Sequence, residues 1–147
     1  MTPSGNGFLQ KWGLVPLRLV VGTVFLMHGG QKLFDFGISG VSDMLLKLGF
    51  PVPVFWAWVL MILEPLGGFA VLFGWYARPL AFLLAVEMSV AIPVARWKGG
   101  FFTPYGYEFE LTLLGACLTI AMLGAGDISL SRLLRRGSAG RGADQST

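Results

Sequence analysis

The sequence predicts an all-α integral membrane protein, built as a bundle of four transmembrane helices. Its 147 residues are 54% hydrophobic and 13% charged, with a mean hydropathy of +0.69, whereas soluble domains are about 25% charged. A chain of this size cannot bury so much apolar surface in one core, because small domains leave much of their surface in water. The net charge of +3 is therefore interpreted as membrane topology, and nucleic acid is not expected as a partner.

Four apolar stretches account for the helices, since a helix needs about 20 residues to cross the hydrocarbon core. They cover about 12–31, 54–74, 78–95 and 108–126. The first is not predicted to be a cleavable signal peptide, because polar and basic residues follow it where small residues would mark a cleavage site. Residues 12–131 thus form the transmembrane domain, between an N-terminal tail, 1–11, and a basic tail, 132–147, that we expect to be disordered.

The basic residues predict how the bundle is oriented. With four spans both termini lie on one side, and that side also holds most of the basic residues: Lys11, Arg18, Arg78 and the arginines of the C-terminal tail. Basic residues mark the cytoplasmic side of a membrane protein. We therefore expect both termini in the cytoplasm, and a multi-pass protein of the cytoplasmic (inner) membrane.

The first outer loop is predicted to contain a short helix that lies in the membrane interface. Apolar residues recur there at helical spacing, and Gly49 and Pro51 then end the pattern. The apolar residues are Val41, Met44, Leu45 and Leu48. No internal repeat is evident along the chain.

Polar side chains inside the spans are candidates for a site. A charge at the centre of the bilayer costs at least about 2.5–3.5 kcal/mol on insertion scales, so these side chains should face the bundle interior and find partners. At 1.5 Å of rise per residue, five of them gather in the outer half of the bundle: His28, Lys32, Glu64, Glu87 and Glu108. Glu108 is preferred to Glu110 as the interior acid, because it shares a polar stripe with Thr112.

Other residues in the spans are expected to be structural. Arg18 and Arg78 are predicted to pair with acidic groups and to hold the helix register. Small residues let two helix backbones approach closely, and this role is assigned to Gly22, Gly29, Gly67 and Gly68. Glu64 and Pro65 stand together in the middle of the second span, where Glu64 needs a cation such as Lys32, Arg18 or His28 opposite it.

Four segments of the chain carry a further signal: "RLVVGTVFLMHGGQKLF", "LEPLGGFAVLFGWYARPLA", "AVEMSVAIPVA" and "GYEFELTLL". Together they resemble the DoxX family, small four-helix membrane proteins related to subunits of quinol oxidase and thiosulfate:quinone oxidoreductase complexes. The family pattern matches Arg18, Gly22, Gly29, Lys32, Glu64, Gly67, Gly68, Gly74, Arg78, Gly106 and Glu108. His28 fits a position that the family often fills with histidine.

This resemblance implies a subunit or accessory of a membrane redox system that works near quinone. The candidate quinone or proton site is then the cluster of His28, Lys32, Glu64, Glu87 and Glu108, with no catalytic residue assigned. A quinone is the implied cofactor, bound without a covalent link. The implied partners are the lipid bilayer and either the other subunits of a membrane complex or further copies of the chain.

The sequence also excludes several redox chemistries. Cys117 is the only cysteine and His28 the only histidine, so one chain cannot supply a dithiol, an iron–sulfur cluster or a bis-histidine haem. No metal site is expected. Two alternatives remain: a non-catalytic membrane anchor or assembly subunit whose buried charges are structural, and a small proton-coupled permease that uses its glutamates. Whether the chain is part of an enzyme is left open.

Overall fold

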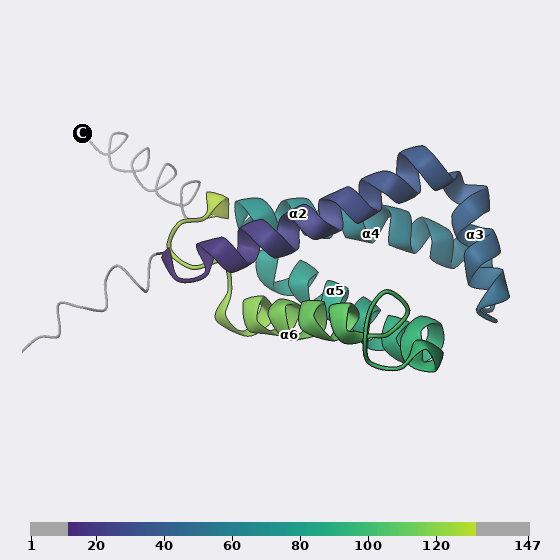
Figure 1. Ribbon diagram of the computed structural model, residues 1–147. Coiled ribbons are helices and arrows are strands. Elements are labelled where there is room, and N and C mark those ends of the chain that lie inside the picture. The colour runs from purple at the N-terminus through teal and green to yellow at the C-terminus, as the bar shows by residue number, and fades with distance from the viewer. Residues whose placement is uncertain (1–11, 132–147) are drawn as a thin grey trace, which may run out of the picture.

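The computed structural model describes residues 12–131, and these residues form an all-α structure, as predicted (Figure 1). Four long helices alternate in direction. The elements follow one another as α2 (Val15–Gln31), the π-helix η1 (Lys32–Phe36), α3 (Gly37–Lys47), α4 (Pro53–Phe73), α5 (Ala77–Ala91), the π-helix η2 (Ile92–Arg96), the 3-10 turn η3 (Trp97–Gly99) and α6 (Glu108–Leu123). The two predicted tails lie outside the described residues.

Two of these helices are long and apolar enough to cross a membrane: α4, and the continuous helix from Ala77 to Gly99. The other two long helices are shorter than the apolar stretches that predicted them. In α2 a proline, Pro16, occupies the first turn, where its missing N–H costs nothing. In α6 the helix ends at Leu123, because Gly124 has a φ of 84° that a helix cannot continue.

The outer faces of the long helices are apolar. Val20, Met27 and Met122 expose between 62% and 76% of their surface, and other large apolar side chains are exposed on α4 and α5. A protein in water does not present so much contiguous apolar surface. These faces are suited to contact with lipid.

The helices pack as two antiparallel pairs, α2 with α4 and α5 with α6 (Figure 1). Fully buried apolar side chains, such as Phe25 of α2, Leu84 of α5 and Ile120 of α6, form the core between the pairs. Within the first pair the backbones approach closely at Gly22 and Gly68. A Cβ added to Gly68 would lie 2.8 Å from the Gly22 carbonyl oxygen and 2.7 Å from the Leu26 nitrogen.

The helix predicted in the first outer loop is present as α3. It presents Val41 and Leu45 to α4, where both are buried against Ala57 and Met61, whereas Met44 is exposed. In Figure 1 α3 lies at the end of the molecule opposite the first residues of α2. That end is called the α3 end below.

Arg18 closes the opposite end of the bundle. Only 4% of this residue is exposed. Its Nε and Nη2 donate to the carbonyl oxygens of Val71 and Leu72, both at 2.9 Å, and its Nη1 donates to those of Ala125 and Ile128, both at 2.6 Å. The predicted pairing with an acid is therefore wrong. The guanidinium instead satisfies carbonyls at the end of α4 and beyond α6, which have no partner within a helix.

Arg78 holds the end of α6 in a similar way, through the carbonyls of Met122 and Leu123 at 3.2 Å and 3.4 Å. It too binds backbone oxygens rather than an acid. The two helix pairs also match along the sequence. Arg78 follows Arg18 by the same number of residues as the start of η2, Ile92, follows the start of η1, Lys32. Each antiparallel pair thus has an arginine at the start of its first helix that caps the end of its second.

The hydrogen bonds of Arg18 to the four carbonyls can be tested with Arg18→Lys, which keeps the charge but loses the planar, forked guanidinium group. Each hydrogen bond from a charged donor contributes about 1.5–3 kcal/mol, so we expect the free energy of unfolding in detergent to fall by about 2–4 kcal/mol. Arg78→Lys is the matched control. Its residue is exposed and its bonds are long, so its effect should stay below about 1 kcal/mol. Equal losses in the two variants would contradict the assignment.

The glycine contact between α2 and α4 gives a second test. Gly68→Ala should lower the free energy of unfolding by about 1–3 kcal/mol, because the new methyl group meets backbone atoms that cannot move aside easily. Gly115→Ala is the control, since a Cβ at Gly115 of α6 meets nothing within 4 Å. We expect it to be neutral or slightly stabilising. Both variants are compared by thermal unfolding in the same detergent. A Gly68→Ala variant as stable as the wild type would refute close packing at this position.

Candidate functional site

The centre of the candidate site is an ion pair between Lys32 and Glu64. The Lys32 Nζ donates to the Glu64 Oε1. Glu64 lies in the middle of α4 with a side chain only 3% exposed, and the Lys32 side chain is 18% exposed. A carboxylate so deeply buried requires a counter-charge. Of the three cations that the sequence offered for Glu64, the structure selects Lys32.

Local packing explains why Lys32 can reach Glu64. Gly29 lies directly against α4, where a Cβ would come 2.5 Å from the Pro65 Cδ and 3.1 Å from the Glu64 Cβ. The proline ring thus fits against a helix that carries no side chain at that point, and α4 continues through Pro65 unbroken. The regular helix α2 then changes to the π-helix η1 at Lys32. Single π-turns of this kind often occur at functional sites.

Glu87 of α5 is the third member of this cluster. One turn before it, Leu84 packs on Gly67 of α4, where a Cβ would lie 2.9 Å from the Leu84 Cδ1. Because α4 and α5 run antiparallel, Glu87 lies at the level of Glu64, and it interacts electrostatically with Glu64 and Lys32. The Oε2 atoms of Glu64 and Glu87 are both buried, and neither has a hydrogen-bond donor among the described residues. The structure therefore brings together Lys32, Glu64 and Glu87, from three helical segments, around two carboxyl groups and one ammonium group.

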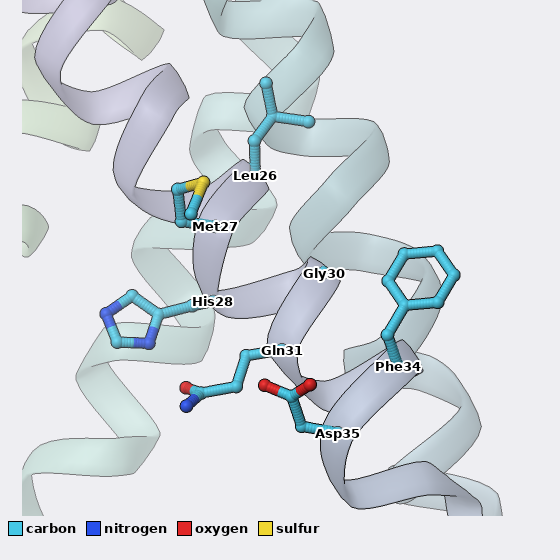
Figure 2. A pocket seen from close by; sticks show the side chains of 7 residues that line it. All are labelled: Leu26, Met27, His28, Gly30, Gln31, Phe34 and Asp35. Atoms are coloured by element: carbon cyan, nitrogen blue, oxygen red, sulfur yellow. The ribbon is translucent and has the colours of Figure 1, made fainter.

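His28 does not join this cluster, contrary to expectation. Its side chain is exposed, and its ring centroid lies 6.1 Å from that of Phe109 on α6. It borders a surface hollow of about 490 Å³ at the junction of α2 and η1 (Figure 2). The hollow mixes apolar and polar side chains, and its lining consists of Leu26, Met27, His28, Gly30, Gln31, Phe34 and Asp35.

The interior acid of α6 is Glu110, not Glu108. Glu108 accepts hydrogen bonds from the backbone N and Oγ1 of Thr103, at 2.8 Å and 2.6 Å, and so closes the preceding loop. Glu110 is 7% exposed and accepts a bond of 2.7 Å from the Arg96 Nε at the end of η2. The predicted polar stripe faces outward: Thr112 is exposed, and its hydroxyl donates to the Glu108 carbonyl of its own helix.

A signal for the pair of Arg96 and Glu110 was present in the sequence. The two residues have opposite charges and flank the same loop, so a search for charge pairs across that loop would have found them. The expectation failed because it ranked the acids by their neighbours along α6 alone. The face of α6 that is buried depends on how α6 packs against α5, where Cys117 and Leu113 are buried.

The chemistry available in the cluster is proton exchange and hydrogen bonding. The described residues contain no group of three or more side chains that could hold a metal ion. Cys117 is a buried free thiol on α6, close enough to Glu87 to interact with it electrostatically. The cluster thus offers two acids and an amine in a nonpolar setting, with a thiol beside it.

The comparisons with known proteins fit this architecture. The family model described as DoxX matches residues 13–97. The chain belongs to the DoxX family. The matched range contains Lys32, Glu64 and Glu87, so the whole cluster lies within the part of the chain that the family model covers.

Three relatives are similar to this chain over most of its length. "Putative oxidoreductase CatD" of Bacillus subtilis is 29% identical over 125 residues, which are 85% of this chain and 89% of the relative. An uncharacterised protein of Haemophilus influenzae is 34% identical over 82% of this chain and 90% of its own. "Inner membrane protein YphA" of Escherichia coli is 28% identical over 81% and 88%. No solved structure matches the chain significantly.

These relatives and the apolar helices confirm the predicted localisation. The chain is a protein of the inner membrane with transmembrane helices. The exposed apolar faces of the two candidate spans, α4 and the helix from Ala77 to Gly99, are suited to contact with lipid.

The pairing of Lys32 with Glu64 can be tested by a double-mutant cycle. Lys32→Met removes the cation and leaves a buried acid, which should lower the free energy of unfolding by about 3 kcal/mol. Adding Glu64→Gln to the same chain removes that penalty, so the double variant should recover most of the loss. The cycle is measured by unfolding in detergent. Additive losses would show that the two residues act independently.

Proposed function

We propose that this protein is a membrane subunit of a quinone-linked redox system, in which Lys32, Glu64 and Glu87 exchange protons with a quinone bound beside them. The observation that carries the proposal is the buried cluster itself, with two carboxyl oxygens that have no donor among the described residues. Reduction of a quinone takes up protons as well as electrons, and a positioned carboxyl group or amine can deliver them.

Composition and relatives support a redox role that is shared with other components. With one cysteine and one histidine, the chain supplies acids and bases rather than an electron carrier of its own. A relative carries the name "Putative oxidoreductase CatD". We propose that the electrons come from a partner protein in the membrane and that this chain provides the quinone and proton site.

The proposed orientation puts both termini in the cytoplasm and the α3 end outside. The excess of basic residues on the side of the termini supports this orientation. His28 then lies near the outer surface, one helical turn before Lys32. There it is proposed to contact the quinone from the lipid side, as a weaker partner than the cluster.

Mass spectrometry of lipid extracts tests the proposal. The protein is purified gently as wild type, as Glu64→Gln, as His28→Ala and as Glu108→Gln. The last is the control, because Glu108 serves the loop and lies outside the cluster. We expect quinone to be retained by the wild type and by Glu108→Gln, strongly depleted in Glu64→Gln and weakened in His28→Ala. Intact folding is checked by circular dichroism.

Equal quinone in all four samples, or none in the wild type, would refute the proposal. The cluster would then be a structural ion pair, and the chain a non-catalytic anchor or assembly subunit. The alternative of a proton-coupled permease would require proton flux in liposomes that depends on Glu64, which the quinone proposal does not predict.

A further inference from the structure

The charges in the cluster do not balance if both acids are ionised. Glu64 and Glu87 would contribute two negative charges and Lys32 one positive charge, in a region from which water is largely excluded. Two carboxylates that share a site disfavour each other's charged form, and an uncompensated buried charge is strongly destabilising. A single added proton makes the cluster neutral.

The geometry provides a place for that proton. Two carboxylate oxygens are both acceptors, so they can form a hydrogen bond only when a proton lies between them. Leu84 of α5 packs on Gly67 of α4, where a Cβ would lie 2.9 Å from the Leu84 Cδ1. Because α4 and α5 run antiparallel, this contact brings Glu64 and Glu87, each one turn away from it, to the same level of the bundle. The Oε2 atom of each is buried and has no donor among the described residues, so a proton held between the two carboxyl groups would supply one.

The other groups around the two acids do not change this count. From α2 and η1 only Lys32 is directed at them, while His28 lies beside Phe109. From α6 the buried thiol of Cys117 interacts electrostatically with Glu87, and the buried Glu110 is paired with Arg96. The charged residues of α3, Asp43 and Lys47, are exposed and turned away.

Access to the cluster differs between the two ends of the bundle. Toward the α3 end, Lys32 is partly exposed and follows Gln31, which lines the hollow together with Asp35 (Figure 2). Toward the other end lies a layer of fully buried apolar side chains, including Val71 and Leu84. Beyond that layer, farther from the α3 end, the Arg18 guanidinium donates hydrogen bonds to the backbone carbonyls of Val71 and Ala125.

We propose that Glu64 and Glu87 share one exchangeable proton, balanced by Lys32, and that this proton exchanges with the compartment at the α3 end. This inference rests on the proposed function and deepens it, because it specifies how many protons the cluster holds and on which side they exchange. It also implies that the cluster is not part of a continuous path for protons through the bundle.

Labelling with dicyclohexylcarbodiimide tests the shared proton without reference to quinone. This apolar reagent adds to a protonated carboxyl group in a membrane: the acid proton moves to a carbodiimide nitrogen, and the carboxylate oxygen bonds to the central carbon. Rearrangement gives a stable acylurea, and no group leaves. Peptide mass spectrometry then shows which glutamate carries the label.

The expected pattern follows from the charge count. The wild type should carry one label per chain, divided between Glu64 and Glu87. Glu87→Gln should lose the label, because Glu64 and Lys32 alone are neutral without a proton. Lys32→Met should carry a label on both acids, and Lys32→Arg should restore the single label. Glu110, buried and paired with Arg96, is the internal control and should stay unlabelled throughout.

Two results would overturn the shared proton: a persistent label on Glu64 in folded Glu87→Gln, or a wild type that stays unlabelled. Glu87→Gln decides the matter even if Lys32→Met fails to fold. For the side of exchange, the protein is reconstituted in one orientation into sealed vesicles whose inner and outer pH are set separately. Labelling should fall as the pH at the α3 end rises. Dependence on the other compartment, or on neither, would refute exchange at the α3 end.

A loss of quinone binding with the labelling pattern intact would refute only the proposed function. Retained quinone with the wrong labelling pattern would refute only the shared proton.

Discussion

The burial of the Glu64 carboxylate in the middle of an apolar helix is the constraint on which the arrangement of this protein depends. In a bilayer such a group must find a cation or a proton, and the surrounding elements are built to provide both. Gly29 allows α2 to lie against Pro65, and the π-turn at Lys32 follows one turn later. The ammonium group reaches Glu64, and α5 adds a second acid, Glu87.

At the end of the bundle opposite α3, the requirement is to supply hydrogen-bond donors to the carbonyl groups at helix ends. Helix ends leave carbonyl groups without partners, and near the hydrocarbon core water is scarce. Arginine suits this task, because its planar fork donates several hydrogen bonds and keeps its charge. Arg18 and Arg78 both serve backbone carbonyls. This end is therefore held by fixed hydrogen bonds, and the titratable cluster is left to the middle of the helices.

The bundle thus separates a structural end from a chemical centre, and this separation bears on function. A proton site that is closed on one side by apolar packing and by the hydrogen-bonded Arg18 can exchange protons without letting them cross the membrane. In the quinone-linked role proposed above, this property would prevent a proton leak that dissipates the energy of the redox reaction. The pair of Arg96 and Glu110 is more exposed than that of Lys32 and Glu64, and its charges already balance.

By itself the sequence determined the all-α class, the approximate positions of the four long helices, α3, the family and the membrane location. These follow from apolar length, turn residues and motif spacing, which are local along the chain. It also named Lys32 as one of three cations that could pair with Glu64, because the depth of a residue in the bundle follows from its position along a helix. Only the tertiary structure decided which side chains meet: His28 turned toward Phe109, Glu110 replaced Glu108, and the arginines bound carbonyls. Side-chain partners depend on helix rotation and on which helices pair, and a single helix pattern does not encode either.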